Sequence, residues 1–437
     1  MAIGRKLFGT DGVRGEAGTF LTAELATALG KAAAASLDIE RPQILIVRDT
    51  RESGPMLEAG LALGLAQAGV DVELGGVAPT PAAAIAVRRD GFDLAAVISA
   101  SHNPWTDNGI KFFGPDGHKL TDEREAEIEA RLAAPVASDR TGAITASRAA
   151  ERGYASALLE RYGALDLRGL RVLLDCANGA AYEVAPEVFR ALGAEVTVLG
   201  DRPDGRNINA GCGSTYPEAL LGALDGHDAG FAFDGDADRL LACDRDGRLL
   251  DGDDLLVLVA AHLKGSGRLP GNGVAVTQMS NYGVRGALAA DGIELCETAV
   301  GDRYLLAALR ERDWALGAEP SGHLIDRNFA PSGDGTSAAL LALEALAGRD
   351  LADVTPVKKL PQVLRNVTVA GHARTAATHP DVRVAVRDAE AALAGRGRVL
   401  VRPSGTEPLV RVMAEAPSAR EAEAVCGELA AAVSACG

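Results

Sequence analysis

The chain has 437 residues, which at about 150 residues per domain predicts two to four domains, each long enough to bury its own core. Hydrophobic residues make up 47% of the chain and charged residues 24%, which excludes global disorder. The formal charge of −16 and an aromatic content of 4% argue against partners such as nucleic acid or an anionic membrane.

One sequence pattern recurs three times along the chain: an apolar strand, a polar turn, an Ala/Leu-rich helix, a glycine and a second strand. The copies begin at Gln43–Asp49, Arg171–Asp175 and Gly273–Thr277. Strands that alternate with helices indicate βαβ units and largely parallel sheets, and the glycines suit left-handed helix caps. From about Val363 the order is instead strand, helix, strand, strand, helix, which predicts an α+β domain with an antiparallel sheet.

We therefore predict an α/β protein with three related α/β domains, whose sheets are mixed but largely parallel, and a C-terminal α+β domain. The stretch Leu132–Gly153 is rich in small and polar residues and is predicted to be a linker, and a new apolar helix begins at Leu255. The predicted domains are 1–150, 151–254, 255–362 and 363–437.

The cysteines and the N-terminal residues indicate the cellular compartment in which the protein is expected. Six cysteines without a CxxC pair predict reduced thiols rather than a disulfide framework or a zinc site. The N-terminal residues contain no apolar targeting core, and no apolar run approaches the length that spans a bilayer. We therefore expect a cytoplasmic protein.

The segment Ala232–Leu240 (AFDGDADRL) carries three alternating carboxylates, those of Asp234, Asp236 and Asp238. Alternate side chains can converge on one side, where two carboxylates about 4 Å apart repel by about 4 kcal/mol at an effective dielectric constant near 20. Hard oxygen ligands of this kind suit Mg²⁺. The alternative is a solvated acidic turn, but apolar residues on both flanks favour a buried strand end and a metal site.

The segment Ala95–Phe113 (AAVISASHNPWTDNGIKFF) places Ser101 directly after an apolar strand. Open α/β sheets bind ligands at the carboxyl ends of their strands, so Ser101 is a candidate nucleophile. His102 or Lys111 could then move a proton or anchor a phosphate. The other interpretation, a plain strand-to-turn junction, stays open on this segment alone.

Three further segments carry weaker signals. The turn in 401–411 (VRPSGTEPLVR) suits an anion through Arg402, Ser404, Gly405, Thr406 and Arg411, although it is also ordinary hairpin chemistry. In the loop Gly317–Ile325, Glu319 and Ser321 could bind sugar hydroxyls, whereas His323 by itself is interpreted as structural. The N-terminal loop Phe8–Gly15 could place Arg14 near an anion, but a glycine-rich loop alone is weak evidence.

Together these segments resemble the α-D-phosphohexomutase superfamily over nearly the whole chain. The motifs occur in order as FGTDGVRG (8–15), ISASHNP (98–104), DNGIKFF (107–113), DGDADR (234–239), EPSGH (319–323) and RPSGTEP (402–408). Within the superfamily, DCANGAAY (175–182), NINAGCGST (207–215) and VGDRYL (300–305) are similar to the enzymes that act on glucosamine phosphates. Pro320 and Tyr216 depart from the family pattern.

The resemblance implies four domains around one cleft and a role for each candidate residue. Ser101 is expected to be a phosphoserine that binds Mg²⁺ together with Asp234, Asp236 and Asp238. The expected catalytic residues besides Ser101 are Lys111, His323 and Arg14. The residues expected to bind substrate are Arg239, Glu319, Ser321, Arg402, Ser404, Gly405, Thr406 and Arg411, the last five holding the phosphate that does not react.

The reaction implied by the resemblance is the interconversion of glucosamine 6-phosphate and glucosamine 1-phosphate. This isomerisation by intramolecular phosphoryl transfer would pass through a phosphoserine enzyme and a hexose 1,6-bisphosphate, and would supply UDP-N-acetylglucosamine and cell-wall precursors. The expected partners are these small phosphosugars, and a homodimer is compatible with the sequence. Two alternatives stay open, a glucose or mannose phosphate mutase of the same superfamily and a non-catalytic phosphosugar-binding protein.

Overall fold

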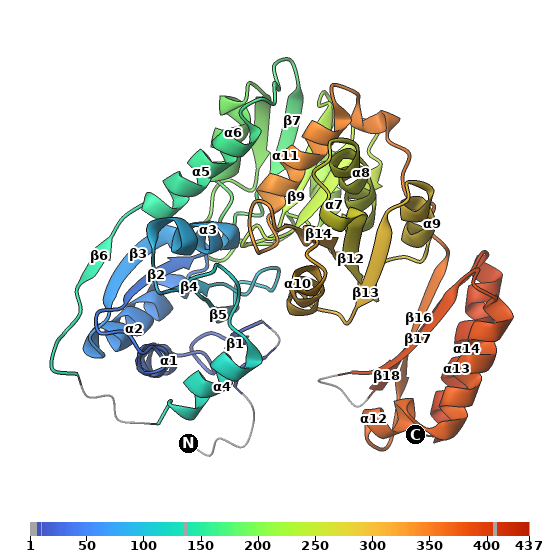
Figure 1. The fold of residues 1–437 in the computed structure, drawn as a ribbon, viewed down its shortest axis with the longest axis horizontal. Helices are drawn as coiled ribbons and strands as arrows, with labels where there is room; N and C mark the ends of the chain where they lie inside the picture. The colour runs from blue at the N-terminus through green and yellow to red at the C-terminus, as the bar shows by residue number, and fades with distance from the viewer. Residues whose placement is uncertain (1–6, 10, 134–137, 405–408, 437) are drawn as a thin grey trace. The chain divides into compact units, whose positions relative to one another are not determined.

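The computed structural model describes residues 7–9, 11–133, 138–404 and 409–436 (Figure 1). The chain forms two compact units. The large unit consists of Met1–Met279 and Ile293–Thr355, and the small unit consists of Ser280–Gly292 and Pro356–Gly437. The small unit therefore contains one internal segment of the chain as well as its C-terminal part.

The first sheet of the large unit consists of β1 (Val13–Glu16), β2 (Gln43–Arg48), β3 (Asp71–Val77), β4 (Leu94–Ile98), β5 (Asp107–Phe113) and β6 (Ile144–Ala146). Its order is β1-β5-β4-β2-β3-β6, with parallel pairing from β4 to β6 and antiparallel pairing of β5 with both neighbours. Its helices are α1 (Ala23–Ala35), α2 (Gly54–Gln67), α3 (Thr80–Asp90) and α4 (Asp122–Ala130).

Helices cover both faces of this first sheet, with α1 and α2 on one side and α3 on the other (Figure 1). Ile44 and Ile46 of β2 belong to the core shared with α1 and α2. Leu45 and Val47, which alternate with them and point to the opposite face of the sheet, are equally buried. Because both faces of the central strands are covered, these strands are continuous apolar runs rather than alternating ones.

The second sheet has the order β11-β10-β9-β7-β8 and the third has the order β13-β12-β14-β15. Their strands are β7 (Arg171–Asp175), β8 (Glu195–Leu199), β9 (Ala229–Phe233), β10 (Leu240–Asp244), β11 (Leu249–Leu250), β12 (Gly273–Thr277), β13 (Glu294–Thr298), β14 (Leu316–Ala318) and β15 (Leu324–Asp326). The helices of this region are α5 (Ala149–Tyr162), α6 (Val184–Ala191), α7 (Pro217–Gly222), α8 (Gly252–Gly265), α10 (Asp302–Glu311) and α11 (Gly335–Leu346), with short 3₁₀ turns at Pro270–Asn272 and Leu351–Asp353. Parallel pairs form the centre of each sheet, and antiparallel hairpins close one edge.

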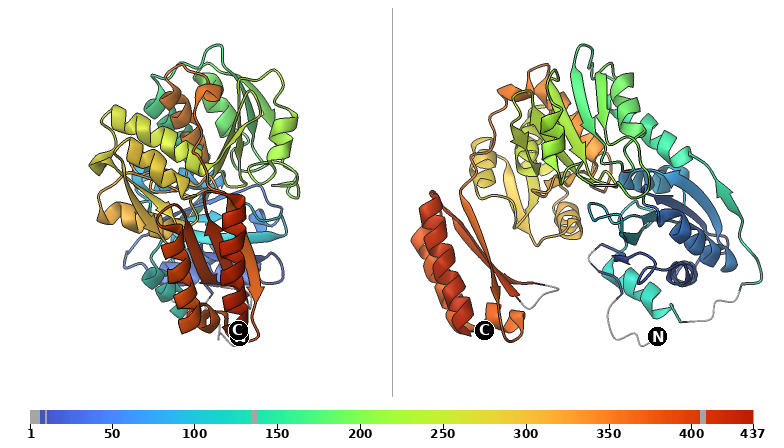
Figure 2. Two further views of the ribbon diagram at one scale, coloured as in Figure 1. Left: turned by 90° about the vertical axis from the view of Figure 1, so that its right-hand side faces the viewer. Right: turned by 180° about the vertical axis from the view of Figure 1, so that it is seen from behind.

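The small unit is built on a three-stranded antiparallel sheet of order β16-β18-β17. Its elements are β16 (Gln362–Thr368), β17 (Arg398–Pro403), β18 (Leu409–Glu415), α9 (Gly283–Ala290), α12 (Ala373–Ala377), α13 (Pro380–Leu393) and α14 (Ala419–Cys436). Helices α13 and α14 lie side by side on one face of the sheet (Figures 1 and 2). The buried carboxylate of Glu415 ties α9 to the sheet, because it accepts the backbone N–H of Tyr282 at 2.9 Å.

The predicted fold class is confirmed. Each of the three repeats begins on an observed strand, and the glycines after their helices, Gly69, Gly193 and Gly292, have φ angles of 89°, 103° and 62°. The prediction that Leu132–Gly153 is a linker is wrong in part, because β6 and the first turn of α5 lie within this stretch. The side chains of β6 are exposed, so this edge strand leaves no apolar pattern in the sequence. The domain boundaries stay a prediction.

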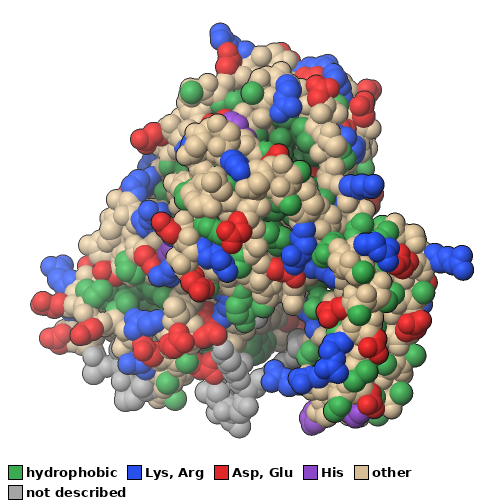
Figure 3. Space-filling view, turned by 45° about the vertical axis from the view of Figure 1, so that its right-hand side comes forward, with side chains coloured by type: hydrophobic (Ala, Val, Ile, Leu, Met, Phe, Trp, Pro, Cys, Tyr) green, Lys and Arg blue, Asp and Glu red, His purple; other side chains and the backbone are tan. Residues whose placement is uncertain are grey.

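On the face shown in Figure 3, acidic and basic side chains are interspersed. Among the helices of the described residues, none combines the length and the apolar character that crossing a bilayer requires.

Glycines allow α1 and α2 to pack closely. A Cβ at Gly64 would lie 2.1 Å from the carbonyl oxygen of Thr27, and one at Gly60 would lie 2.6 Å from that of Ala23. The Thr27 hydroxyl donates to the carbonyl of Gly60 at 2.9 Å across the same contact. The backbones therefore touch directly, and a side chain on either glycine has no space.

We predict that Gly64→Ala lowers the free energy of unfolding by about 1–3 kcal/mol, because the extra methyl group forces the two helices apart. Thermal or urea unfolding measures the change. Gly265→Ala at the exposed end of α8 is the matched control, since a Cβ there meets no atom within 4 Å. The close contact is refuted if the two variants are equally stable.

Candidate active site

Ser101 lies in the loop that follows β4, in an unusual backbone conformation. Its φ angle is 52°, in the left-handed region, and its side chain is 2% exposed. Its hydroxyl donates to Asp234 Oδ2 at 2.5 Å, and its N–H donates to Ser99 Oγ at 2.9 Å. Such a conformation costs a non-glycine residue about 1–3 kcal/mol, so the contacts around the loop must hold it in place.

The three aspartates lie in the loop between β9 and β10. All are buried, and each offers a carboxylate oxygen within 4.8 Å of those of the other two. Gly235 lets this loop approach the serine loop, because a Cβ there would lie 2.6 Å from the carbonyl oxygen of Ser101. The structure thus brings together two motifs that are 133 residues apart in sequence.

The three carboxylates have unequal surroundings. Lys111, on β5, pairs with Asp236 Oδ2 at 2.6 Å and lies 3.8 Å from Asp238 Oδ2, while Thr80 Oγ1 donates to the same Asp236 oxygen at 2.6 Å. Burial and the neighbouring Asp238 and Asp236 charges raise the pKa of Asp234 well above its usual value. The buried Asp236 Oδ1 has no hydrogen-bond partner among the described residues. Lys111 therefore balances only part of the negative charge, and one buried oxygen of Asp236 is left available to a cation.

Asp238 is held ionised by His323, from the loop between β14 and β15, and by Arg239, its neighbour in the same loop. Its Oδ1 lies 3.5 Å from His323 Nδ1 and 3.9 Å from Arg239 Nε. Although burial opposes ionisation of both partners, their attraction holds the pKa of Asp238 below its usual value and raises that of His323 to about 9. His323 is thus placed against the Asp-rich loop as a cation.

The predicted sugar-binding residues lie in the hairpin loop between β14 and β15. Glu319 is half-buried, and its Oε1 accepts the N–H of Gly301 at 3.1 Å. Ser321 is exposed, and the backbone of Gly322 accepts a hydrogen bond from Leu240 N at 3.0 Å. This loop therefore packs directly on the strand that leaves the Asp-rich loop.

An ionic cluster near Arg14 was missed by the sequence reasoning. Asp11 pairs with both Arg14 and Lys119, and Lys119 Nζ pairs with Asp302 Oδ2 at 2.5 Å. Although burial opposes ionisation, Lys119 and Lys111 hold the pKa of Asp11 well below its usual value. Asp11 and Asp302 both lie inside the motifs FGTDGVRG and VGDRYL, which was the signal available in the sequence.

His102, beside the candidate nucleophile, has a neutral side chain. Its Nδ1 lies 3.3 Å from Ser101 Oγ. Burial and the positive charges of Arg239 and Arg14 lower the pKa of His102 to about 4. At neutral pH this imidazole is therefore uncharged, unlike that of His323.

The predicted phosphate-binding residues belong to the small unit. Arg402 and Arg411 are direct cross-strand partners on β17 and β18, and both are half-buried. Burial and the neighbouring Arg411 lower the pKa of Arg402. Like charges directly opposite one another are unfavourable in a sheet, so the pair suits an anion. Ser404 begins the turn beside them, whereas Gly405 and Thr406 lie outside the described residues.

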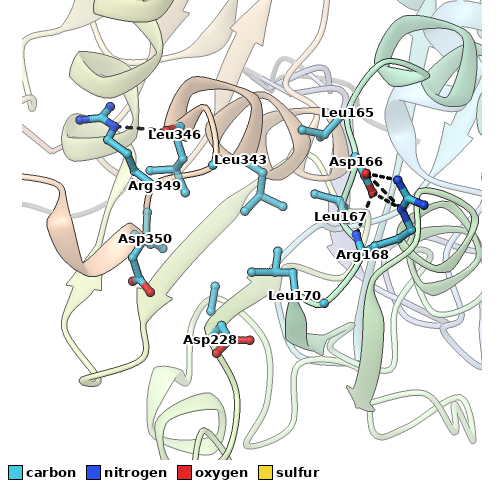
Figure 4. Close-up of a pocket in the computed structure, with 14 residues that line it drawn as sticks. Leu165, Asp166, Leu167, Arg168, Leu170, Asp228, Leu343, Leu346, Arg349 and Asp350 are labelled. Atoms are coloured by element: carbon cyan, nitrogen blue, oxygen red, sulfur yellow. Dashed lines mark hydrogen bonds and ion pairs between the residues drawn. The ribbon is translucent and has the colours of Figure 1, made fainter.

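A separate cavity of about 390 Å³ shares no residue with these loops (Figure 4). Leucines such as Leu167, Leu170 and Leu343 line it. Two charged groups at its rim have partners within the same wall, Arg168 with Asp166 and Arg349 with the carbonyl of Leu346. The cavity therefore lacks the convergent reactive groups that surround Ser101.

Comparison with family models accounts for nearly the whole chain. The models described as phosphoglucomutase/phosphomannomutase match residues 5–137 (alpha/beta/alpha domain I), 152–247 (alpha/beta/alpha domain II), 251–365 (alpha/beta/alpha domain III) and 364–432 (C-terminal domain). The chain belongs to the phosphoglucomutase/phosphomannomutase family.

Individual members of the phosphoglucomutase/phosphomannomutase family agree. A phosphoglucosamine mutase of Desulforamulus reducens is 48% identical over 97% of this chain and 98% of its own length. A family protein of known structure from Burkholderia thailandensis is 25% identical with a TM-score of 0.83 over 99% of this chain and 97% of its own. The N-acetylphosphoglucosamine mutase of Aspergillus fumigatus, solved with GlcNAc-6P and magnesium, shares the fold at 19% identity, with a TM-score of 0.70 over 99% of this chain and 96% of its own.

We predict that Lys111→Met lowers the melting temperature in a chelator, because breaking a buried ion pair costs about 3–5 kcal/mol. Added divalent cation is expected to restore more stability to this variant than to the wild type, since the cluster then carries one more uncompensated negative charge. Scanning calorimetry with and without Mg²⁺ measures both effects.

Thr80→Val is the matched control for Lys111→Met. It removes an uncharged hydrogen-bond donor to the same Asp236 oxygen and leaves the number of charged groups unchanged. We expect it to lose about 1–3 kcal/mol and to respond to cation as the wild type does. Equal melting temperatures of Lys111→Met and wild type in chelator would contradict the electrostatic interpretation.

Proposed function

We propose that this protein is a phosphoglucosamine mutase, which interconverts glucosamine 6-phosphate and glucosamine 1-phosphate. The single observation that carries the proposal is the Ser101 hydroxyl 2.5 Å from Asp234 Oδ2, within a buried cluster of three carboxylates. Binding alone needs no phosphorylatable hydroxyl beside a metal site. The high identity to curated phosphoglucosamine mutases over nearly the full chain supports the choice of sugar.

The cation that fits this cluster is Mg²⁺. Asp234, Asp236 and Asp238 supply hard oxygen ligands, and Asp236 Oδ1 is buried without a hydrogen-bond partner among the described residues. A phosphoserine adds a further charge of about −1.5 to −2 at neutral pH, which makes a divalent ion still more necessary. When bound, the ion would neutralise charge that develops on the transferring phosphoryl group.

The residues of the chain would then carry two phosphoryl transfers. Phosphorylated Ser101 gives its phosphoryl group to O1 of glucosamine 6-phosphate: the new O1–P bond forms as the Oγ–P bond breaks, and the O1 proton leaves through a nearby base. The resulting 1,6-bisphosphate reorients, and its 6-phosphoryl group returns to Ser101: the Oγ–P bond forms as the O6–P bond breaks, the hydroxyl proton of Ser101 leaves through a nearby base, and O6 takes up a proton. Glucosamine 1-phosphate leaves, and the enzyme is again phosphorylated.

The remaining residues have roles that follow from their charge and position. Lys111 and His323 are buried cations beside the aspartates, suited to stabilise or move a proton near the leaving oxygen. Glu319 and Ser321 would hold sugar hydroxyls, and Arg14 and Arg239 would attract the phosphosugar. Arg402 and Arg411, with Ser404 and the turn that includes Gly405 and Thr406, would bind the phosphate that does not react.

We also propose that the enzyme works in the cytoplasm. All six cysteines are unpaired, and Cys176, Cys212, Cys243 and Cys426 are buried. Reduced thiols persist in reducing compartments. The substrates of the proposed reaction are phosphorylated metabolites of the same compartment.

The proposed activity predicts turnover that depends on Ser101. With Mg²⁺ and a trace of hexose 1,6-bisphosphate, the wild type should convert glucosamine 6-phosphate to the 1-phosphate, with a higher kcat/KM than for glucose or mannose phosphates. Ser101→Ala should lose nearly all activity. Intact mass and peptide mapping should place one phosphate on Ser101 in the wild type and none in this variant.

Ser156→Ala, an exposed serine on α5, is the control for the loss of a hydroxyl and should be fully active. Absence of turnover in a preparation that carries phosphorylated Ser101 would reject the mutase proposal. A higher kcat/KM for glucose or mannose phosphate would instead change the assigned sugar.

The metal assignment predicts that removing one charged ligand lowers the activity and weakens Mg²⁺ binding together. Asp236→Asn should raise the Mg²⁺ concentration needed for half-maximal rate by about tenfold or more, because a charged ligand becomes neutral. Asp246→Asn, at an exposed turn after β10, is the matched control and should titrate normally. A normal Mg²⁺ titration of Asp236→Asn would contradict the assignment.

A further inference from the structure

The guanidinium group of Arg51 is completely buried beneath the loop that carries Ser101. Arg51 follows β2, and its side chain is 0% exposed. Its Nε donates to Asp49 Oδ2 at 2.8 Å, and its Nη2 donates to the carbonyls of Ser101 and Asn103, each at 2.8 Å. Its Nη1 donates to the carbonyl of Asp107 at 2.9 Å and to that of Pro104.

An arginine side chain has five N–H donors in a rigid planar fork. All five are used here, one on the carboxylate of Asp49 and four on backbone carbonyls between residues 101 and 107. The group touches neither the Ser101 hydroxyl nor the three aspartates by any of these bonds. It therefore fixes the shape of the loop rather than taking part at the reacting oxygen.

The partner of Arg51 holds the other side of Ser101. Asp49 Oδ2 also accepts the hydroxyl of Ser99 at 2.7 Å, and Ser99 Oγ in turn accepts the N–H of Ser101 at 2.9 Å. The N–H of Ser101 is thus held through Ser99, and its carbonyl is held by Arg51. The buried carboxylate of Asp49 therefore orients both Arg51 and Ser99, the two residues that hold the backbone of Ser101.

A second element reaches the same carbonyl. Asn209, in the loop after β8, donates from Nδ2 to the carbonyl of Ser101 at 2.9 Å and to that of Asn103 at 3.3 Å. Asn209 is buried and itself has a φ angle of 56°. Ser101 is therefore held from two sides, by the loop after β2 and by the loop after β8.

We infer that Arg51 is a positioning residue for phosphoryl transfer, which together with Asp49, Ser99 and Asn209 holds Ser101 in its left-handed conformation with Oγ facing Asp234. The inference rests on the proposed function, because it takes Ser101 as the residue that carries the phosphoryl group. A doubly charged phosphoserine beside three carboxylates is pushed away from them, and the saturated guanidinium resists that displacement. Misplacement of a reacting group by about 1 Å can reduce the rate about 100-fold.

The test compares two variants that disturb the backbone around Ser101 from different sides. Arg51→Lys keeps the charge beside Asp49 but cannot reach four carbonyls, and Ser99→Ala removes the contact with the Ser101 N–H. We expect kcat to fall about 100-fold in Arg51→Lys and about tenfold in Ser99→Ala, with the KM for glucosamine 6-phosphate within about threefold of wild type. Because both act on one backbone conformation, the double variant should lose less than the product of the two losses.

Arg327→Lys is the matched control for the loss of a guanidinium. Arg327 also donates to backbone carbonyls, those of Leu309 at 3.0 Å and Trp314 at 2.6 Å, in another part of the large unit. We expect its kcat to be unchanged. A merely structural role for Arg51 would lower only the amount of active enzyme, which also lowers the apparent kcat at an unchanged KM. The kcat is therefore calculated per phosphorylated Ser101, counted by phosphopeptide yield, and a structural role predicts a wild-type value on that scale.

The outcomes separate this inference from the proposed function. If wild-type enzyme turns over and carries phosphate on Ser101 while Ser99→Ala and Arg51→Lys keep wild-type kcat, the positioning role is rejected. If Arg51→Lys fails to fold, a wild-type kcat in both Ser99→Ala and Asn209→Ala rejects it equally. If the wild type shows neither turnover nor phosphorylated Ser101, the proposed function fails instead.

Discussion

The site depends on the close approach of a seryl hydroxyl to a group of buried carboxylates. Asp234 illustrates the constraint, because it accepts from the Ser101 hydroxyl while burial and its acidic neighbours raise its pKa. The pKa of Asp238 is instead lowered, because the positive charges of His323 and Lys111 lie beside its carboxylate and outweigh the effect of burial. A cluster of this kind is stable only if positive charge is supplied, partly by side chains and partly by a cation that the oxygens are arranged to bind.

The backbone makes that approach possible at two points. Gly235 leaves room for the Ser101 carbonyl, and Ser101 itself has a left-handed conformation that turns its hydroxyl toward the Asp-rich loop. Neither feature stabilises the fold locally, since the left-handed residue is strained and the glycine has extra freedom in the unfolded chain. The stabilisation comes from outside the loop, through the hydrogen bonds that Arg51 and Asn209 donate to its carbonyls.

Periodicity and motifs were sufficient to predict the fold class and the loops that meet at the site. The Asp-rich segment was recognised because three alternating carboxylates between apolar strands repel one another unless a cation is bound among them. Arg51 was not recognised, because Asp-Thr-Arg after a strand is typical of any polar turn, and nothing in the sequence says that the guanidinium faces inward. Lys119 was missed for a similar reason, since its partners Asp11 and Asp302 are distant in sequence and their pairing is a property of tertiary structure.

The two groups of charged residues proposed to bind phosphate differ in physical character. Near Ser101, the basic side chains of Lys111 and His323 offset only part of the charge of the three carboxylates, so in the proposed cycle the net charge there would depend on the bound cation and on phosphorylation of the serine. In the small unit, Arg402 and Arg411 are direct partners across two strands, and the charge of this proposed phosphate-binding pair would stay constant through the cycle. Guanidinium groups recognise a phosphate and not the particular carbon that bears it, so a pair of this kind suits either phosphate of the proposed bisphosphate. The proposed reaction therefore combines a serine whose charge changes with each phosphoryl transfer and a pair of arginines whose charge does not change.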